Sequence, residues 1–180
     1  MMYQPQLLQD FRFQKSEMSS DEKKQAIKQQ SERLGNLQME LQRSKLPVIV
    51  LVEGWGTSGK GTQIASMIQE LDPRFFQVIS LSAPSPEELA KPFLCRHIKN
   101  IPENGKILFL DSGWMDESVR ALENGQLSVT EYAHRLEEIR IFERQLCDNG
   151  YLLVKLFLHI DRKEQKKRIR HLLDSADTSW

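Results

Sequence analysis

This sequence lacks long apolar runs and the pattern of a secretory leader, and it has only two cysteines. None of its apolar runs approaches the roughly 20 residues that a membrane-spanning helix needs. The first residues, Met-Met-Tyr-Gln-Pro, lack the basic and apolar regions of a secretory signal. The two cysteines, Cys95 and Cys147, fall on separate predicted helices, which favours reduced thiols over a disulfide framework. We therefore expect a cytoplasmic protein without a membrane partner.

Net charge, repeats and metal-binding patterns are also missing. The 25 Lys and Arg residues balance the 25 Asp and Glu residues, so a polyanion must be held by local patches and not by a general field. We expect no nucleic-acid partner. No metal-ligand spacing and no nucleophile–His–acid arrangement is visible among the histidines, which are His97, His134, His159 and His171. With 39% apolar and 28% charged residues, the 180 residues fit one globular domain.

One glycine-rich segment carries most of the functional information. It reads Gly-Trp-Gly-Thr-Ser-Gly-Lys-Gly-Thr over 54–62, follows the apolar run 47–52 and precedes a helical pattern. In a P-loop, a strand delivers the chain into such a turn, whose backbone N–H groups converge on phosphate oxygens. The following helix directs its positive dipole end to the same anion, and Lys60 adds a mobile charge. The segment therefore predicts phosphate or nucleotide binding by Gly54, Gly59, Lys60, Gly61 and Thr62.

The residue after Lys60 departs from the strict P-loop pattern. That pattern has Ser or Thr directly after the lysine, whereas here Gly61 intervenes and Thr62 follows. The resulting GKGT phrase is the variant found in nucleoside-monophosphate kinases. A glycine-rich strand-to-helix turn without a ligand is the alternative interpretation, and the correct flanks on both sides favour the P-loop.

The amino-terminal part predicts one polar helix. Ser19-x-x-Glu22 is typical of a capping box, and the helix should run to about Arg43 and end at Pro47. Its expected apolar stripe consists of Ile27, Leu34, Leu37 and Leu41. A thin stripe of this kind usually lies on the surface of a domain, and a dimer contact is the alternative.

From Pro47 onward, apolar strands alternate with helices. Strands are expected at 48–52, 77–81, 106–111 and 151–159. Helices are expected at 60–71, from 86 with an interruption at Pro92, from 129 until Gly150, and from 162 to 173. This alternation predicts an α/β fold with three α/β/α layers, a parallel sheet covered on both faces, and right-handed crossovers. We divide the chain into an N-terminal helical extension, 1–46, and a P-loop kinase-like domain, 47–180.

Two single residues are candidates for phosphoryl-transfer chemistry. Asp111 ends an apolar strand, where open α/β sheets bind ligands and where a P-loop protein holds magnesium with a carboxylate. An ordinary turn or N-cap aspartate is the alternative. Arg96 follows the second strand, in the region that faces the phosphate acceptor in monophosphate kinases, and its planar fork suits phosphate oxygens. The alternative is a solvated arginine.

The last predicted helix is rich in cations. Its positive residues are Arg162, Lys163, Lys166, Lys167, Arg168 and Arg170, against Glu164. A run of cations of this kind is most often a solvated helix face. The functional alternative is a lid that binds a polyanion. The spacing of these residues alone does not distinguish the two interpretations.

Several phrases together resemble the type 2 polyphosphate kinases. They are Glu53-Gly-Trp55-x-x-x-Gly59-Lys60-Gly61, Leu71-Asp72-Pro73-Arg74, Pro84-Ser-Pro86-Glu87-Glu88-Leu89, Pro102-x-x-Gly105, Phe142-Glu143-x-x-Leu146, the stretch Gly150 to Gln165, and Trp180. The resemblance covers about 47–180 and implies magnesium-dependent phosphoryl transfer between inorganic polyphosphate and AMP, ADP or a related nucleotide. It also implies strand order 2-3-1-4, a catalytic Lys60, a magnesium-holding Asp111 and a lid served by Arg168.

The chain departs from the family pattern at two places beside the expected phosphates. Gly56 stands where active domains usually have Asp, and Ser112 stands where they usually have Arg. The family chain also continues past Trp180. We therefore expect the amino-terminal, partly degenerate half of a tandem enzyme or a truncated form, with a homo-oligomer or a tandem catalytic domain as possible partners. The alternatives to catalysis are a non-catalytic polyphosphate- or nucleotide-binding half and an ATP-dependent small-molecule kinase.

Overall fold

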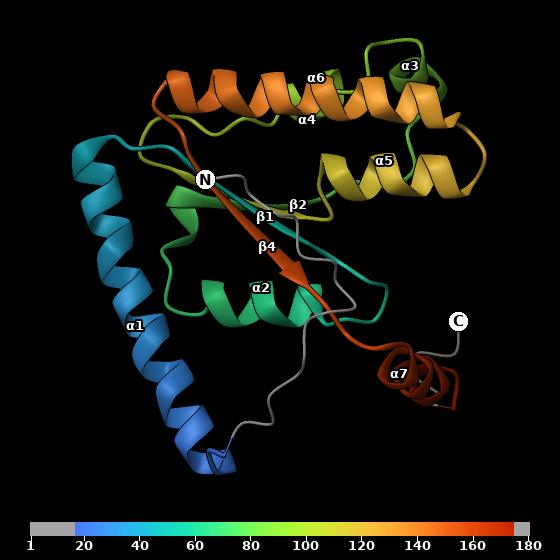
Figure 1. Cartoon of the computed structure of the whole chain (residues 1–180). Coiled ribbons are helices and arrows are strands. Elements are labelled where there is room, and N and C mark those ends of the chain that lie inside the picture. The colour runs from blue at the N-terminus through green and yellow to red at the C-terminus, as the bar shows by residue number, and fades with distance from the viewer. Residues whose placement is uncertain (1–16, 175–180) are drawn as a thin grey trace, which may run out of the picture.

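A four-stranded parallel sheet forms the centre of the computed structural model, which describes residues 17–174 (Figure 1). The strand order is β2-β3-β1-β4, as predicted. Trp180 and most of the amino-terminal segment before Met18 lie outside the described residues. The elements are α1 (Ser20–Ser44), β1 (Val48–Gly54), α2 (Lys60–Ile68), a 3-10 turn (Pro73–Phe75), β2 (Phe76–Ser80), α3 (Pro86–Leu89), α4 (Cys95–Ile98), β3 (Ile107–Asp111), α5 (Trp114–Glu123), α6 (Val129–Asp148), β4 (Leu152–Leu158) and α7 (Arg162–Asp174).

Helices cover both faces of the sheet, which confirms the three-layer prediction. Successive residues of a strand point to opposite faces, so Ile49 and Leu51 pack with α5 and α6, and Val50 packs with α2 and α1. The strands β1 and β3 pair in parallel from Val48 opposite Ile107 to Val52 opposite Asp111. This register brings the end of β3 beside the point where β1 enters the glycine-rich segment.

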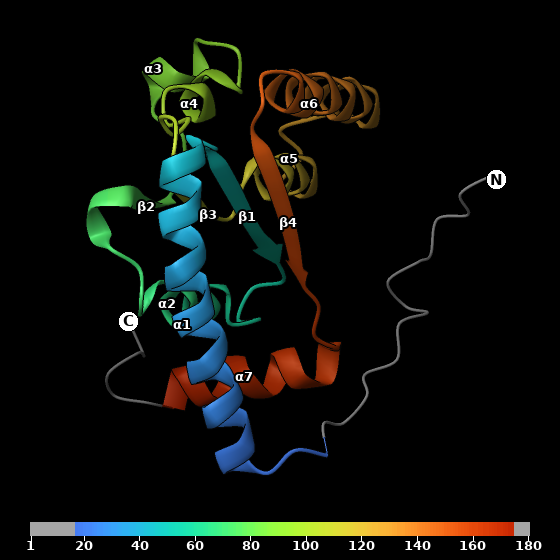
Figure 2. The same ribbon diagram turned by 90° about the vertical axis from the view of Figure 1, so that its left-hand side faces the viewer.

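The amino-terminal helix α1 lies across α2 and has a different buried stripe from the predicted one (Figure 2). Ile27 and Leu37 are about half exposed, whereas Ser31 and Gln38 are buried. The Ser31 hydroxyl donates to the Ser66 carbonyl, and the Gln38 amide donates to the Asp72 carbonyl. The stripe prediction was wrong at these positions because hydrogen bonding makes the two polar side chains suitable for burial. The helix runs to Ser44, one residue beyond the predicted Arg43, and its C-cap Lys45 has a left-handed conformation.

Residues 114–123 form α5, a helix that the sequence pattern did not predict. Its buried side chains are Trp114, Ser118 and Ala121, two of which are too small or too polar to mark an apolar stripe. The indole N–H of Trp114 donates to Glu143 on α6. The capping box predicted at the start of α1 is present, and α3 and α6 also begin with capping boxes.

The strand β4 lies at one edge of the sheet and is much more exposed than β1 or β3. Leu152 is 45% exposed and Phe157 is 47% exposed, although the sequence predicted strands covered on both faces. The helix α6 packs near the start of β4, so the middle of this edge strand has less helical cover than the central strands. Both Cys95 and Cys147 are free thiols, as predicted. Within residues 17–174, no helix is both long and apolar enough to cross a membrane.

Candidate functional site

The glycine loop, residues 54–62, joins the carboxyl end of β1 to the start of α2. Gly54 and Gly59 have φ angles of 137° and 97°, a region that favours glycine, and Thr57 has φ 63°. A side chain at Gly54 would also collide with the backbone of Leu158 on the neighbouring strand. The predicted loop residues Gly59, Lys60, Gly61 and Thr62 therefore come together at the amino end of α2.

Hydrogen bonds in this loop use its carbonyl groups and leave N–H groups open. The Lys60 ammonium donates to the carbonyls of Gly54 and Trp55, at 2.8 and 3.4 Å. Within residues 17–174, the backbone N–H groups of Gly56, Thr57 and Gly59 have no acceptor among the protein's own hydrogen bonds. The first N–H groups of α2 lack intrahelical partners because every helix begins in this way. The arrangement presents donors and a cation on one side, which suits an anion.

Asp111 ends β3 directly beside this loop. A Cβ atom added to Gly61 would lie 3.9 Å from Asp111 Oδ2, which shows how close the carboxylate is to the first turn of α2. The following residue, Ser112, has φ 66° and donates its backbone N–H to the Val52 carbonyl. The sheet register thus brings Asp111 and Lys60 to the same end of the sheet, as the sequence predicted.

Two further carboxylates, which the sequence reasoning missed, lie near Lys60. Asp116 Oδ2 is 3.8 Å from Lys60 Nζ. Glu53 is 7% exposed and accepts a hydrogen bond from the Met115 backbone N–H. Burial first, and the charge of Asp116 second, raise the pKa of Glu53 above its ordinary value. The site therefore holds more negative charge than Asp111 alone would supply.

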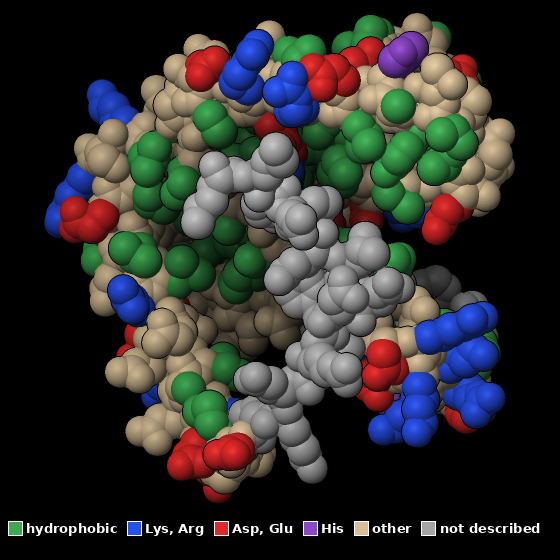
Figure 3. Space-filling model, in the orientation of Figure 1, with side chains coloured by type: hydrophobic (Ala, Val, Ile, Leu, Met, Phe, Trp, Pro, Cys, Tyr) green, Lys and Arg blue, Asp and Glu red, His purple; other side chains and the backbone are tan. Residues whose placement is uncertain are grey.

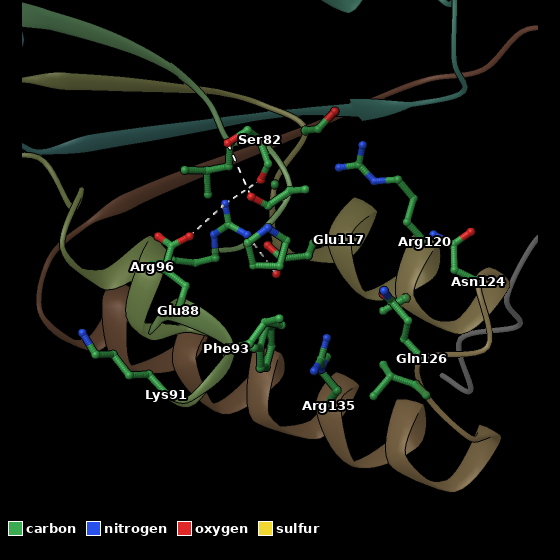
Figure 4. A pocket seen from close by; sticks show the side chains of 18 residues that line it. Ser82, Glu88, Lys91, Phe93, Arg96, Glu117, Arg120, Asn124, Gln126 and Arg135 are labelled. Atoms are coloured by element: carbon green, nitrogen blue, oxygen red, sulfur yellow. Dashed lines mark hydrogen bonds and ion pairs between the residues drawn. The ribbon is translucent and has the colours of Figure 1, made fainter. Parts of the chain in front are cut away.

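Arg96 lies at the inner wall of a neighbouring pocket and is already paired (Figure 4). Its side chain is 4% exposed, lies 3.7 Å from Glu88 and 3.6 Å from Glu117, and donates to the Ser82 carbonyl. Its Nε atom is buried without a partner among the described residues. Burial favours a raised pKa for Glu117, but the hydrogen bond from His97 and the nearby arginines lower this pKa below its ordinary value. The burial of Arg96 excludes the alternative interpretation that it is a solvated surface arginine.

The pocket beside Arg96 has a volume of about 500 Å³ and lies between the segment after β2 and the helices α5 and α6. Arg120 and Arg135 lie on its other side in Figure 4. The Arg135 guanidinium stacks on the Phe93 ring, 4.3 Å from its centroid. Ser112 and Gly113 also line the pocket, which joins it to the end of β3 and the Asp111 region. The sequence pattern does not single out Arg120 or Arg135, because an arginine on a helix carries no local signal of the cavity that it lines.

The helix α7 lies across the carboxyl ends of β1 and β4 and contacts the glycine loop (Figure 2). Arg168 faces the loop and donates to the carbonyls of Thr57 and Ser58, at 3.2 and 3.0 Å. The other cations of this helix are exposed and gather on its outer surface (Figure 3). The predicted cation cluster is therefore divided between an inner face with Arg168 and an outer, solvated face.

This sheet, loop and helix arrangement defines an α/β protein with the P-loop kinase fold. The family described as polyphosphate kinase 2 (PPK2) matches residues 17–180. The chain belongs to this family. A Pseudomonas aeruginosa protein named "Polyphosphate:AMP phosphotransferase" is 30% identical over 164 residues, which are 91% of this chain and 33% of that protein. A Rhodopseudomonas palustris "ADP-polyphosphate phosphotransferase" is 30% identical over 167 residues, covering 86% of this chain and 58% of its own length.

Solved structures show the same likeness. The crystal structure of polyphosphate kinase 2 from Arthrobacter aurescens TC1 superposes with a TM-score of 0.85 at 27% identity, over 91% of this chain and 59% of that one. The chain thus spans a third to somewhat over half of the relatives described here. The likeness confirms the predicted family and fold.

Proposed function

We propose that this chain transfers phosphoryl groups between inorganic polyphosphate and a nucleotide, AMP or ADP. The observation that carries the proposal is the glycine loop, whose open N–H groups at Gly56, Thr57 and Gly59 lie beside the Lys60 ammonium in a member of this family. In the reaction, the terminal P–O–P link of polyphosphate breaks and a P–O bond forms to the nucleotide phosphate. The names of the relatives above support this pair of substrates.

The loop residues supply binding and charge. The backbone around Gly54, Gly59, Gly61 and Thr62 holds phosphate oxygens, and the Lys60 ammonium follows the transferred phosphoryl group. Such a reaction needs little covalent chemistry from the protein, because positioning and charge stabilisation lower its barrier. Lys60 is therefore the residue on which turnover depends most.

The carboxylate of Asp111 suits magnesium. Within residues 17–174, no group of three or more acidic, His or Cys side chains forms a closed metal cage. Magnesium typically binds one or two carboxylates, with water and substrate phosphates as its other ligands, so the single Asp111 carboxylate beside Gly61 fits it. When bound, the ion neutralises charge on the phosphates. Asp111 would hold the ion next to the loop.

The pocket near Arg96 suits the acceptor nucleotide. It opens beside Ser112 and Gly113 and presents the guanidinium groups of Arg120 and Arg135 to its interior (Figure 4). Arg96 is neutralised by two carboxylates, so its role is to shape the wall of the pocket through Glu117 and Ser82. Arg120 and Arg135 are better placed to meet phosphate oxygens.

A non-catalytic binding half of a tandem enzyme is the second candidate. The specific observation in its favour is the Lys60–Asp116 pair, in which the loop lysine already has a carboxylate partner. In addition, Gly56 and Ser112 stand at positions where the resemblance leads us to expect a charged residue. The chain also covers 33% of the Pseudomonas aeruginosa relative. An ATP-dependent small-molecule kinase, the third interpretation, has no support in the family match.

Binding and turnover measured together test the proposal. Lys60→Ala should lower the affinity for inorganic tripolyphosphate in calorimetry by at least ~10-fold, equivalent to about 1.4 kcal/mol, without lowering folded content in circular dichroism. Lys106→Ala, at the opposite end of the sheet, is the matched control. Unchanged affinity in Lys60→Ala would remove the loop as the phosphate site. Phosphorylation of AMP and ADP with polyphosphate and magnesium separates the catalytic proposal from the binding-half candidate.

A further inference from the structure

Three carbonyl groups in a row on the glycine loop accept hydrogen bonds from α7. The Gln165 side-chain amide donates to the Gly56 carbonyl at 3.1 Å. Arg168 donates to the next two carbonyls, those of Thr57 and Ser58. These contacts join residues 109 to 111 positions apart in the sequence. The loop is therefore held to the helix through three consecutive carbonyl groups.

Fastening the carbonyl groups also orients the N–H groups. In a trans peptide the C=O of one residue and the N–H of the next point in opposite directions. When the carbonyls of Gly56 and Ser58 turn toward α7, the N–H groups of Thr57 and Gly59 turn away from it. In the described part of the chain, these two N–H groups are among those without a protein acceptor. The contacts with α7 thus favour the loop conformation that presents donors to an anion.

Arg168 is held in a way that suits a structural contact better than a phosphate ligand. Its Nε donates to Glu164 at 2.8 Å, so the guanidinium charge already has a carboxylate beside it. Its Nη1 donates hydrogen bonds to the two loop carbonyls, those of Thr57 and Ser58. Hydrogen bonds between a charged donor and a carbonyl are also stronger than those between neutral groups. The remaining cations of α7 are exposed, and among residues 17–174 the hydrogen bonds from α7 to the loop carbonyls come from Gln165 and Arg168.

We propose that Gln165 and Arg168 are positioning residues, which hold the glycine loop in its anion-binding shape through its carbonyl groups. The inference rests on the proposed function in one respect, since the anion is the phosphate chain of that function. It assigns α7 a role that precedes ligand binding: the helix shapes the loop before any phosphate arrives. Losing either contact should loosen the loop even in the absence of ligand.

Two measurements on the full 180-residue chain test this role. The first is the ¹⁵N order parameter of residues 56–59 without ligand, which should fall from the rigid range near ~0.85 toward ~0.6 in Gln165→Ala and Arg168→Gln. The second is the affinity for inorganic tripolyphosphate, which should fall by ~10-fold in Arg168→Gln. Lys167→Gln, which removes the same charge from the outer face of α7, is the matched control. It should leave the order parameters unchanged and lower affinity at most ~3-fold.

The outcomes separate this inference from the proposed function. Order parameters that stay in the rigid range in both variants would overturn the positioning role, whatever the affinity for tripolyphosphate. If the affinity of Arg168→Gln still fell, that combination would indicate a direct contact between Arg168 and phosphate. Loosened loops in both variants, with an unchanged loop in Lys167→Gln, support it. If the unmodified chain fails to bind tripolyphosphate while the variants still loosen the loop, the proposed function fails and the positioning role stands.

Discussion

The carboxylate of Asp116 lies 3.8 Å from the ammonium of Lys60, so the cation of the glycine loop is paired before any phosphate binds. Both side chains are mostly buried, at 15% and 19% exposure, and solvent screens such a pair less than it screens a surface pair. The Lys60 ammonium also donates to two loop carbonyls. A phosphate chain must therefore compete with Asp116 for this lysine.

Asp116→Asn should raise the affinity for inorganic tripolyphosphate. Removing the competing carboxylate leaves the Lys60 charge to the ligand, and we expect a gain of a few fold, roughly 1 kcal/mol or less. Calorimetry measures the change, with Asp148→Asn at the exposed end of α6 as the control for lost negative charge. An unchanged or weaker affinity in Asp116→Asn would show that the pair does not restrain Lys60.

Gly56→Asp combined with Ser112→Arg should raise turnover of AMP and ADP. The two changes restore a carboxylate and a guanidinium near the most highly charged part of the transition state, so they should act on turnover more than on substrate binding. The structure has space at Gly56, where, among residues 17–174, an added Cβ would come within 4 Å of Gln165 Nε2 alone, at 3.9 Å. Ser112 already has φ 66°, so arginine would enter a backbone conformation that a non-glycine residue occupies now.

The unmodified chain sets the baseline for that comparison. We expect it to be far slower than the ~1–100 per second of ordinary kinases. The assay supplies polyphosphate, magnesium and AMP or ADP and follows product with time. Turnover of the unmodified chain within the ordinary range would show that Gly56 and Ser112 do not impair it.

Lys166→Gln combined with Lys167→Gln should flatten the salt dependence of tripolyphosphate binding. Both lysines are exposed. Each one that meets a phosphate releases a counterion on binding. By analogy with nucleic acids, the slope of log affinity against log salt should fall by about 1–2. The matched control is Lys23→Gln with Lys24→Gln on α1. Equal slopes in the two double variants would make the outer lysines an ordinary solvated face.

Glu53→Gln should change the pH dependence of stability. Burial and the Asp116 charge raise the pKa of Glu53 above its ordinary 4.5, so the folded protein holds this proton more tightly than the unfolded chain. The contribution of Glu53 to stability is therefore greatest below about pH 4.5 and is lost as the pH rises through the raised pKa. Each unit of that shift corresponds to about 1.4 kcal/mol.

Urea unfolding at pH 4 and pH 7 measures this effect. Glu53→Gln should be at least as stable as the unmodified chain at pH 7, with the difference vanishing near pH 4, because its amide oxygen can still accept from the Met115 N–H. Glu123→Gln, an exposed change, should shift neither curve. A loss of stability at pH 7 in Glu53→Gln would mean that the ionised carboxylate stabilises the fold.

Local signals explain what the sequence predicted well. The glycine loop and the capping boxes are each defined by a few neighbouring residues, and the strands β1 and β3 are continuous apolar runs. The helix α5 escaped prediction because its buried face uses Ser118 and Ala121 beside a single large residue, Trp114. The buried stripe of α1 was not predicted because Ser31 and Gln38 become suitable for burial only through hydrogen-bond partners elsewhere in the sequence.

Contacts distant in the sequence explain what was missed at the site. The Glu53–Met115 hydrogen bond joins residues 62 positions apart, and the Gln165–Gly56 bond joins residues 109 apart. Neither pair has a local pattern that would reveal it. Lys60 and Asp111 could be named as candidates because the loop motif and the end of an apolar strand are local features. The parallel register of β1 and β3 then places Asp111 beside the start of the loop.

Trp55 gives this loop an optical reporter of its own. Its indole N–H donates to His159 Nδ1 at 2.7 Å, and its ring meets Phe157 edge-on with centroids 5.7 Å apart. The ring is 37% exposed, whereas Trp114 is 1% exposed in the core. The chain has a third tryptophan, Trp180, so a Trp180→Phe variant leaves Trp55 as the source of the long-wavelength part of the fluorescence. A shift of the loop away from the junction of β4 and α7 would change the intensity of that emission without any attached dye.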